Sequence, residues 1–292
     1  MIVYFNGRLI PKEDVRISPD DRGFLFADGV YDVIRSYDGR LFKAEDHFRR
    51  MDRSLRALLI DGPDLDDLRD AAEQLIRCND LGRGDAKLYI QITRGVAPRR
   101  HAFPDGETPP TVYASAAPFH PPHEKWEHGV RTILVPDIRW ARCDIKSVAL
   151  LPNVLASQQA RESGAEEAVF VRDGVITEGS HTNFCAVFDG QLVTHPKSNH
   201  ILAGIMREVV LDLCGELGIP FREFPISEGE LRKAEELMVL GTTSEIMPVV
   251  QVDDWKVGDA KPGPITTKLQ RAFREMTQSE VRKGDGLRRI PL

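Results

Sequence analysis

A short proline-rich run, Pro118 to Pro122, separates two regions of this chain whose apolar residues follow different patterns. Proline fixes its own backbone angle and lacks a hydrogen-bond donor, so such a run interrupts regular structure and is typical of a linker. The length of 292 residues suits two domains of ordinary size better than one core. We therefore expect an N-terminal domain over residues 1–118, a linker over 119–123 and a C-terminal domain over 124–292.

The first region combines the periodicities of helices and strands. Apolar residues recur at helical spacing over residues 44–60 and 65–78, which predicts two amphipathic helices. Alternation over residues 87–94 and 111–117 predicts two strands. Near the start, Asn6-Gly7 stands between two apolar runs and predicts a hairpin. The smaller, N-terminal domain should therefore be of mixed α/β character.

The second region is richer in short, β-branched segments. Its predicted strands lie at residues 130–135, 166–172, 174–178, 182–190, 191–195 and 236–240. The dipeptides Asp173-Gly174 and Asp189-Gly190 predict hairpin turns. We expect helices over 154–163 and 204–217, and a third from Ser227, where a serine followed three residues later by glutamate forms a capping-box pattern. The whole chain is thus predicted to be α+β, with a larger C-terminal domain that is β-rich and barrel-like (a pseudo-barrel).

The composition argues against several classes of protein. Hydrophobic residues make up 41% and charged residues 29% of the chain, as in ordinary soluble proteins. A net charge of −6 gives no general attraction to nucleic acid or to an anionic membrane, and no apolar run approaches the length of a membrane span. The start, MIVYFNGRLIPKEDV, lacks the features of a secretory signal. The four cysteines have no metal-ligand spacing, so we expect free thiols, no metal and a cytoplasmic location.

Lys146 is the first candidate for chemistry. It lies in the segment RWARCDIKS, between apolar residues and close to two arginines. Apolar neighbours and other cations favour the neutral form of an amine, and a neutral lysine is the nucleophile that forms a Schiff base with a carbonyl group. Glu178, in an acidic turn after a predicted strand, is the second candidate. Either residue alone is also compatible with a solvated surface charge.

Two further segments have the character of anion-binding sites. Gly204-Ile205-Met206-Arg207 opens a predicted helix, and the first amides of a helix are free to bind phosphate. Gly241-Thr242-Thr243-Ser244-Glu245 follows the predicted strand ELMVL and offers hydroxyl and amide donors. An ordinary capped turn would explain either segment alone, so their meaning depends on what accompanies them.

Taken in chain order, these segments resemble the fold-type IV pyridoxal-phosphate enzymes, the group that contains branched-chain aminotransferases, D-amino-acid aminotransferases and aminodeoxychorismate lyase. The resemblance is carried by DRGFLFADGVYDV, QITRGVAPRRHAFP, DIRWARCDIKS, VITEGSHTNF, THPKSNHILAGI and LGTTSEIMPV. These stretches are spread over nearly the whole chain. Within the group, the sequence is most similar to the D-amino-acid aminotransferases.

The resemblance implies pyridoxal 5′-phosphate as the cofactor, with Lys146 as the lysine that bonds to it and then moves a proton to and from the reacting carbon. Glu178 would lie against the pyridine nitrogen, and Arg50 would bind the phosphate. The other expected cofactor residues are Leu202 at the ring face, the amides of Ile205 and Met206, and the hydroxyl of Thr242. D-amino-acid aminotransferases often have threonine where this chain has Met206, so we expect weaker retention of the cofactor.

The resemblance also implies how the substrate is held. In D-specific enzymes a tyrosine, with an arginine and a histidine from a loop of the other subunit, binds the substrate α-carboxylate, and Tyr31, Arg99 and His101 match these residues. Fixing the carboxylate on one side selects the enantiomer. Arg35 and His181 are further candidates for contact with the substrate side chain. The implied partners are amino acids, 2-oxo acids and a second copy of the chain, in a two-fold homodimer whose subunits share their sites.

The leading hypothesis is a ping-pong transamination, in which a D-amino acid such as D-alanine gives up its amino group and a 2-oxo acid such as 2-oxoglutarate receives it. An L-branched-chain aminotransferase is the first alternative: Arg99 and His101 argue against it, whereas VIRSYDG after Tyr31 has some branched-chain character. The second is a lyase of the aminodeoxychorismate type, and the third is a cofactor-binding protein without catalysis. The loop with Arg99 and His101 favours amino transfer over the lyase, and a carrier would need no such loop.

Overall fold

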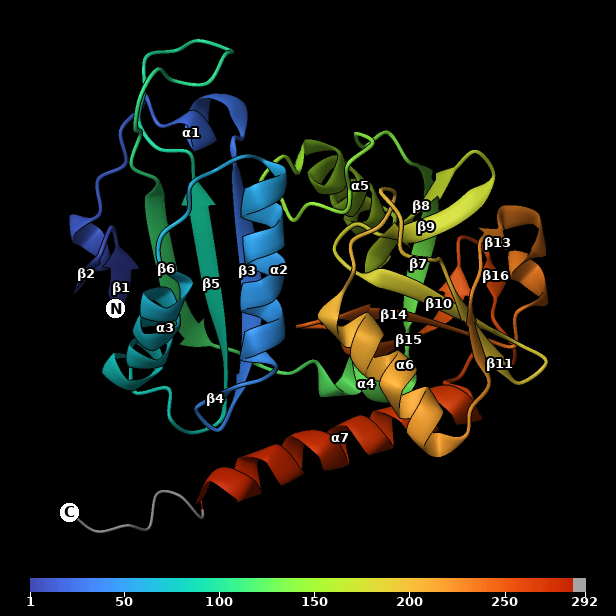
Figure 1. Ribbon diagram of the computed structural model, residues 1–292. Helices are drawn as coiled ribbons and strands as arrows, with labels where there is room; N and C mark the ends of the chain where they lie inside the picture. The colour runs from blue at the N-terminus through green and yellow to red at the C-terminus, as the bar shows by residue number, and fades with distance from the viewer. Residues whose placement is uncertain (286–292) are drawn as a thin grey trace. The chain divides into compact units, whose positions relative to one another are not determined.

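The computed structural model describes residues 1–285, and the chain divides into two compact units (Figure 1). The first comprises Met1–Pro121 together with Ile145–Ala149, and the second comprises Pro122–Asp144 together with the chain from Leu150 on. The short segment Ile145–Ala149 thus packs with the first unit although the residues on either side of it belong to the second. It carries Lys146. The domain boundaries predicted at residues 118 and 124 stay a proposal.

An antiparallel sheet with helices on one face makes up the first unit. Its elements are β1 (Ile2–Phe5), β2 (Arg8–Pro11), the 3-10 turn η1 (Lys12–Asp14), α1 (Arg22–Phe26), β3 (Gly29–Tyr37), β4 (Arg40–Leu41), α2 (Ala44–Ala57), α3 (Leu65–Cys78), β5 (Asp85–Thr93) and β6 (Thr111–Pro118). The strands lie in the order β2-β1-β6-β5-β3-β4, and neighbours in this order are antiparallel. The predicted hairpin, the two helices and the two strands of this region are all present.

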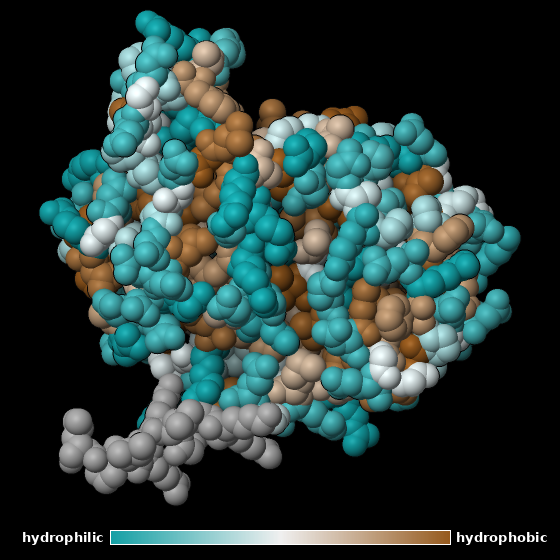
Figure 2. Space-filling view, in the orientation of Figure 1, coloured by the Kyte–Doolittle hydropathy of each residue, from teal (hydrophilic) through white to brown (hydrophobic). Residues whose placement is uncertain are grey.

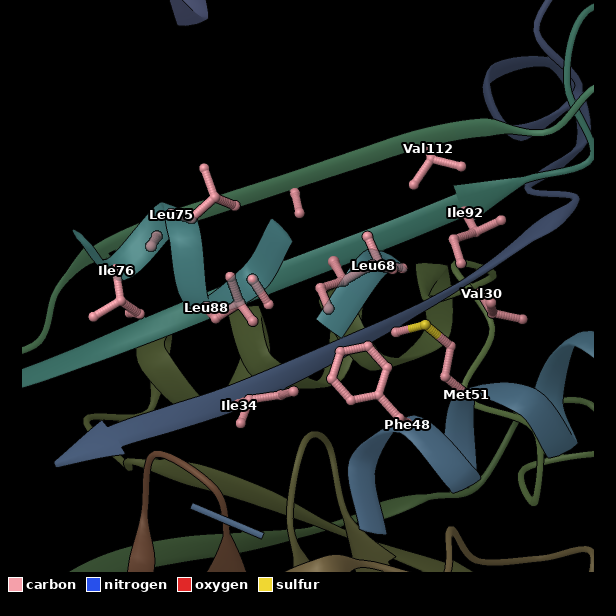
Figure 3. Close-up of a cluster of buried hydrophobic side chains, with 14 of the residues drawn as sticks. Val30, Ile34, Phe48, Met51, Leu68, Leu75, Ile76, Leu88, Ile92 and Val112 are labelled. Carbon is pink, nitrogen blue, oxygen red and sulfur yellow. The ribbon is translucent and has the colours of Figure 1, made fainter. Parts of the chain in front are cut away.

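Helices α2 and α3 cover one face of this sheet (Figure 1). Side chains alternate across a strand, so Val30 and Ile34 of β3 point toward the helices while Tyr31 points away from them. Figure 3 shows the strand residues meeting Phe48 and Met51 of α2 in the buried cluster. Burial of a side chain of this size contributes about 1.5–3 kcal/mol. The sheet therefore has one face that forms the core and another that is available for function.

The second unit contains a ten-stranded sheet. Its elements are α4 (His123–His128), β7 (Val130–Pro136), α5 (Leu151–Glu162), β8 (Glu167–Arg172), β9 (Val175–Gly179), β10 (Asn183–Phe188), β11 (Gln191–Thr194), α6 (Ile205–Leu217), β12 (Phe221–Glu223), β13 (Ile226–Ser227), the 3-10 turn η2 (Glu228–Lys233), β14 (Glu236–Gly241), β15 (Glu245–Val252), β16 (Trp255–Lys256) and α7 (Pro264–Asp285). The strands lie in the order β12-β11-β10-β14-β15-β7-β8-β9-β13, and β16 pairs with β15.

One extra pairing closes part of this sheet into a barrel. Strand β9 pairs with β10 at Glu178 and Asn183, which joins the two ends of the path β10-β14-β15-β7-β8-β9. Val169, Phe184 and Met247 are among the buried residues of the cluster that these strands share. The predicted β-rich, barrel-like domain is thus confirmed, and Glu178 lies at the point where the barrel closes.

Two helical segments differ from the sequence predictions. The helix predicted from Ser227 is only the 3-10 turn η2, and the Ser227 side chain makes no capping hydrogen bond. Ser227 pairs with Val175 in the sheet, and this long-range pairing outweighs the local helix signal. Helix α7 was not predicted, because the carboxylate that accepts its first amides, at Ile265 and Thr266, belongs to the distant Glu236.

Two further predictions from the sequence concern the state of the cysteines and the presence of membrane spans. All four cysteines are free thiols, with Cys78 exposed and Cys143, Cys185 and Cys214 buried, as predicted. Within residues 1–285, the structure contains no helix with both the length and the apolar character that a bilayer crossing requires.

Candidate active site

The predicted site residues form three groups. The first unit holds Lys146, Tyr31 and Arg50 around β3 and α2, and it holds Arg99 and His101 on the loop between β5 and β6. The second unit holds the others, which are Glu178, Leu202, Ile205, Met206 and Thr242.

Lys146 is fixed by its main chain and by its buried neighbours. The Tyr31 amide donates to the Lys146 carbonyl at 3.0 Å, and the Lys146 amide donates to Ser54 Oγ at 3.3 Å. Ile145, which precedes it, belongs to the core of the first unit, and Ser147, which follows it, forms an isolated bridge with Val30 of β3. The direction of the Lys146 side chain is therefore set by contacts that do not involve that side chain.

The Lys146 amine lies over an aromatic ring. Its Nζ atom is 4.3 Å from the centre of the Tyr31 ring, a distance at which ring electrons attract a cation. The Tyr31 ring in turn lies 5.9 Å from that of Tyr89. Burial, with smaller contributions from Tyr31 and Tyr113, raises the pKa of Tyr89 to about 12, so its hydroxyl stays protonated and donates to Gln91. The structure thus brings Lys146 and Tyr31 together on a tyrosine-lined face of the sheet.

Arg50 is part of a buried charge cluster on the inner side of α2. Its Nε and Nη2 atoms donate to the two oxygens of Asp32 at 2.9 and 2.7 Å, and His47 Nδ1 lies 2.8 Å from Asp32. Burial would raise the pKa of Asp32, but the charge of Arg50, and of His47 when protonated, holds it far below its ordinary value. Burial lowers the pKa of His47, and the charges of Arg50 and Lys146 add to that effect against the attraction of Asp32. The cluster therefore keeps the Asp32 carboxylate charged beside the Arg50 guanidinium.

Arg99 and His101 are exposed and converge on one ring. The Arg99 guanidinium lies 5.3 Å from the centre of the Phe26 ring, and the His101 ring lies 5.4 Å from it. Phe26 ends α1, so this helix supplies the platform on which the loop rests. Two basic side chains held on one aromatic ring could bind a carboxylate together.

In the second unit, the Glu178 carboxylate is buried and accepts hydrogen bonds at both oxygens. Arg139 Nη1 donates to Oε1 at 2.5 Å, while Asn183 Nδ2 and the Leu202 amide donate to Oε2 at 3.0 and 2.9 Å. Each of these donors stabilises a negative charge. The arrangement suits a carboxylate that faces a positively charged group.

Arg139 connects Glu178 to a second buried carboxylate. Its Nε and Nη2 atoms donate to Asp137 at 2.9 Å, and its guanidinium lies 4.3 Å from the centre of the Phe170 ring. Burial would lower the pKa of Arg139, but the hydrogen bonds of Asp137 and the charge of Glu178 raise it above its ordinary value. Arg139 therefore stays charged and holds Glu178 in one orientation.

The expected phosphate-binding segments meet around Asn183. Besides Glu178, the Asn183 amide nitrogen donates to the Leu202 carbonyl at 2.8 Å, and a Cβ atom added at Gly204 would collide with the Asn183 side-chain oxygen. Gly204 caps α6, whose first residues are the buried Ile205 and Met206, and its cap lacks a side-chain hydrogen bond.

The turn that contains Thr242 also lies close to Asn183. Asn183 pairs with Leu240 of β14, and Thr242 follows two residues later in the turn between β14 and β15. The second unit thus brings Glu178, the start of α6 and the Thr242 turn to one end of the barrel.

Arg35 and His181, the two further candidates for substrate contact, differ in their surroundings. Arg35 is fully buried, forms an ion pair with Asp85 at 3.2 Å, and lies 4.1 Å from the centre of the Phe119 ring. His181 is half-exposed, and its Nδ1 atom lies 3.0 Å from the buried Glu167. The Arg35 side chain is therefore enclosed by its neighbours, whereas about half of the His181 side chain is exposed.

Sequence reasoning missed the residues that hold the candidates in place. Asp32 directly follows Tyr31, and His47 precedes Arg50 by one helical turn, so the helical spacing of His47 and Arg50 was a usable signal. Arg139 and Asn183 gave no such signal, because the hydrogen bonds from Arg139 to Glu178 and from Asn183 to the Leu202 carbonyl join residues that are distant in the sequence.

Comparisons with known proteins identify the family of the chain. The family model of amino-transferase class IV matches residues 29–252. The D-alanine aminotransferase of Staphylococcus haemolyticus is 41% identical over 278 residues, which cover 95% of this chain and 98% of the relative. That of Bacillus licheniformis is 40% identical over 284 residues, with 97% and 99% covered.

Solved structures of branched-chain aminotransferases share the fold. The Escherichia coli enzyme has a TM-score of 0.88 and 28% identity, with 94% of each chain covered. The Thermoproteus uzoniensis enzyme, solved with norvaline, has a TM-score of 0.85 and 29% identity, with 95% of this chain and 94% of that chain covered. Because the family model spans most of the chain and the curated relatives match nearly all of it, this protein belongs to the class IV aminotransferases.

Proposed function

We propose that this protein is a pyridoxal-phosphate-dependent transaminase that moves the amino group of a D-amino acid, such as D-alanine, to a 2-oxo acid, such as 2-oxoglutarate, in two half-reactions. The curated relatives named D-alanine aminotransferase match 95% or more of the chain at about 40% identity. The observation that carries the choice of substrate is the convergence of Arg99 and His101 on Phe26, because it presents two basic groups to one carboxylate.

The residues present fit pyridoxal phosphate. The start of α6 offers amides without a side-chain cap, and the missing Cβ atom of Gly204 lets the Asn183 side chain pack against the start of this helix. Glu178 is a buried carboxylate suited to a pyridine nitrogen, and the Lys146 amine is half-buried beside Tyr31. When bound, this cofactor supplies an electron-accepting ring that stabilises negative charge on the carbon next to the amino group.

Each residue then has a defined task. Lys146 Nζ would hold the cofactor and would carry the proton that leaves and returns at the substrate Cα. The phosphate would be bound by Arg50, the amides of Ile205 and Met206, and the Thr242 hydroxyl. Leu202 would contact the ring, and Glu178, oriented by Arg139, would hold the ring nitrogen. Tyr31, Arg99 and His101 bind the substrate carboxylate and so decide which enantiomer presents its Cα–H bond correctly.

An assay of both enantiomers tests this proposal. The purified holoenzyme is given D-alanine, L-alanine, D-leucine or L-leucine with 2-oxoglutarate, and the products are separated by chiral chromatography. We expect pyruvate and D-glutamate from D-alanine. The structural likeness to branched-chain aminotransferases supports one rival, an L-specific enzyme. Activity confined to L-leucine would establish that rival.

We also propose a homodimer in which each site takes its carboxylate-binding loop from the partner subunit. Apolar side chains reach the surface on the face shown in Figure 2. On α5, Leu151, Val154 and Leu155 are 69%, 58% and 56% exposed and recur at the spacing of one helix face. An exposed apolar stripe of this kind is typical of a subunit contact. We also propose a cytoplasmic location, which the free thiols support.

Complementation between two inactive variants tests the shared site. A Lys146→Ala chain keeps the loop, and an Arg99→Gln/His101→Gln chain keeps the lysine. Equal co-expression makes half of the dimers mixed, each with one complete site, so we expect about a quarter of wild-type activity. If mixed dimers purified through two different tags have no more activity than either parent, the site lies within one subunit.

A further inference from the structure

The loop that carries Arg99 and His101 lacks a core of its own. Residues 94–110 join β5 to β6 and project beyond the ends of these strands (Figure 1). Neighbouring strands of an antiparallel sheet are usually joined by two to five residues, so a loop of this length needs other means to hold one conformation. Arg99, Arg100, His101, Ala102 and Phe103 are all exposed. Burial of their own side chains therefore does not hold these residues in place.

Arg22 of α1 binds the main chain of this stretch. It is 3% exposed, and its Nη1 atom donates to the Arg100 carbonyl at 2.7 Å and to the Ala102 carbonyl at 3.4 Å. Its Nη2 atom donates to the His101 carbonyl at 3.4 Å. One guanidinium thus reaches three consecutive carbonyls, which fixes the path of the chain through His101 and just after Arg99.

The position of Arg22 is itself fixed. Its Nε atom donates to Asp28 at 2.9 Å, and Arg94 donates to both oxygens of Asp28 at 2.7 and 3.0 Å. Arg94 also donates to the carbonyls of Leu58 and Leu59 and lies 3.8 Å from the centre of the Phe103 ring. Asp28 therefore binds two buried arginines. Arg22 holds residues 100–102, and Arg94, the first residue of the loop, binds the carbonyls of Leu58 and Leu59 and contacts Phe103.

The same arginine supports the ring on which the basic side chains rest. The Arg22 guanidinium lies 4.8 Å from the centre of the Phe26 ring, the ring that Arg99 and His101 also contact. Arg22 thus supports the loop in two ways. It donates to three of the loop's carbonyls, and it contacts the Phe26 ring against which Arg99 and His101 lie.

We propose that Arg22 is a positioning residue for substrate binding, which presents Arg99 and His101 to the substrate carboxylate without touching the substrate. This rests on the proposed function, in which those two side chains bind the carboxylate. Misplacement of a binding group by about 1 Å can cost about a hundredfold, and the loop has no buried side chains in this stretch to compensate. Loss of Arg22 should therefore weaken carboxylate binding far more than it slows the chemistry at Lys146.

The test measures binding of a carboxylate that cannot react. Propionate is titrated as a competitive inhibitor of the holoenzyme for the wild type, Arg22→Gln, Arg22→Lys, Arg99→Gln and Arg16→Gln. Arg16 is the matched control, because it is an exposed arginine that, within residues 1–285, donates only to the nearby carbonyls of Glu13 and Val15. The affinity for pyridoxal phosphate and the unfolding temperature of each variant are measured alongside.

We expect Arg22→Gln and Arg22→Lys to raise the propionate inhibition constant and the KM for D-alanine about 10- to 100-fold, with kcat within about threefold of wild type. Lysine keeps the charge beside Asp28 but concentrates its donors on one nitrogen, so it cannot replace the fork that spans three carbonyls. Arg22→Lys also remains informative if Arg22→Gln does not fold. Arg16→Gln should match the wild type, and no Arg22 variant should change the affinity for pyridoxal phosphate.

The outcomes separate this inference from the proposed function. If Arg99→Gln weakens propionate binding but neither Arg22 variant does, the inference is wrong while the carboxylate-binding role of the loop stands. If Arg99→Gln has no effect, the proposed role of the loop fails and the inference fails with it. If the Arg22 variants lose kcat, cofactor affinity and unfolding temperature together, Arg22 serves stability in general and the inference is overturned.

Discussion

Lys146 and the pair Arg99 and His101 lie on irregular segments of the same unit, but the two segments are held in different ways. Lys146 follows a residue of the core, and main-chain hydrogen bonds join it to β3. Arg99 and His101 lie on an exposed loop that Arg22 holds by its side chain. The reacting amine is thus placed by the backbone, and the substrate-binding groups are placed by another side chain.

The difference predicts how each part tolerates change. Main-chain hydrogen bonds survive most substitutions, so the place of Lys146 should withstand loss of any one nearby side chain that is not in the core. The stretch 100–102, whose three carbonyls accept from one buried guanidinium, has no such reserve, because an unsatisfied buried donor or acceptor costs about 1–3 kcal/mol. Specificity should therefore be lost more easily in this protein than the capacity to bind its cofactor.

The largest expected effect is that of Lys146→Ala. Because the Lys146 main chain holds the segment, removing the side chain should leave the fold intact while activity with D-alanine falls by at least about four orders of magnitude. The visible absorbance of the lysine-bound cofactor should be lost as well. Turnover and circular dichroism of the purified variant check this. Loss of the fold together with the activity would show that the segment depends on the side chain after all.

Ile145→Ala tests the part of the lysine segment that does belong to the core. Ile145 is 5% exposed in the core of the first unit, and a truncation of this kind costs about 2–5 kcal/mol. Ile145→Val, the matched control, should cost only about 0.5–1.5 kcal/mol. Denaturant unfolding gives both values. If Ile145→Ala costs no more than the valine variant, the core does not hold the segment and the comparison fails.

The loop should respond to pH only at the acidic end. Burial would raise the pKa of Asp28, but hydrogen bonds from Arg94 and Arg22 bring it below its ordinary value of 3.8. A lowered carboxyl pKa means that this contact is fully present above the ordinary value and is lost as the pH falls through the lowered one. Hydrogen exchange of residues 98–103, corrected for its intrinsic pH dependence, should thus be constant from about pH 8 to pH 5.

Asp28→Asn provides the comparison for that experiment. Without the carboxylate charge, the same residues should exchange faster than in the wild type throughout the range from about pH 8 to pH 5, because both arginines lose their shared partner. A wild-type transition near pH 6 would instead assign control of the loop to a histidine and would contradict the role given to Asp28.

Local pattern predicted the elements whose partners are close in the sequence. Helix α3 was predicted with its boundaries, and the helix assigned to 204–217 is α6. Helix α7 was missed because the carboxylate that holds its start, Glu236, is distant in the sequence. A single sequence shows which residues can form an element, and it does not show which distant residue will cap it.

The residues of the candidate site also fall into those that the sequence identified and those that it did not. The resemblance to a family identified the residues proposed to touch cofactor or substrate, such as Lys146 and Glu178. The residues that orient them, Arg139 and Arg22, lie in the quoted motifs but received no role, because their partners became apparent only in the fold. Positioning residues are defined by contacts, and contacts over long sequence separations cannot be derived from composition or spacing.

The smallest expected effect is that of Met206→Thr, which tests whether backbone donors dominate at the phosphate as they do at Lys146. Met206 is buried in the first turn of α6, and its amide is available whatever the side chain. Threonine would add one hydroxyl, so we expect the dissociation constant for pyridoxal phosphate to fall by no more than about tenfold. Met206→Val has nearly the shape of threonine without the hydroxyl, so the difference between the two variants isolates that contact. Equilibrium dialysis of the cofactor measures both. A gain above a hundredfold over the valine variant would mean that the helix amides contribute little and that side chains control binding here too.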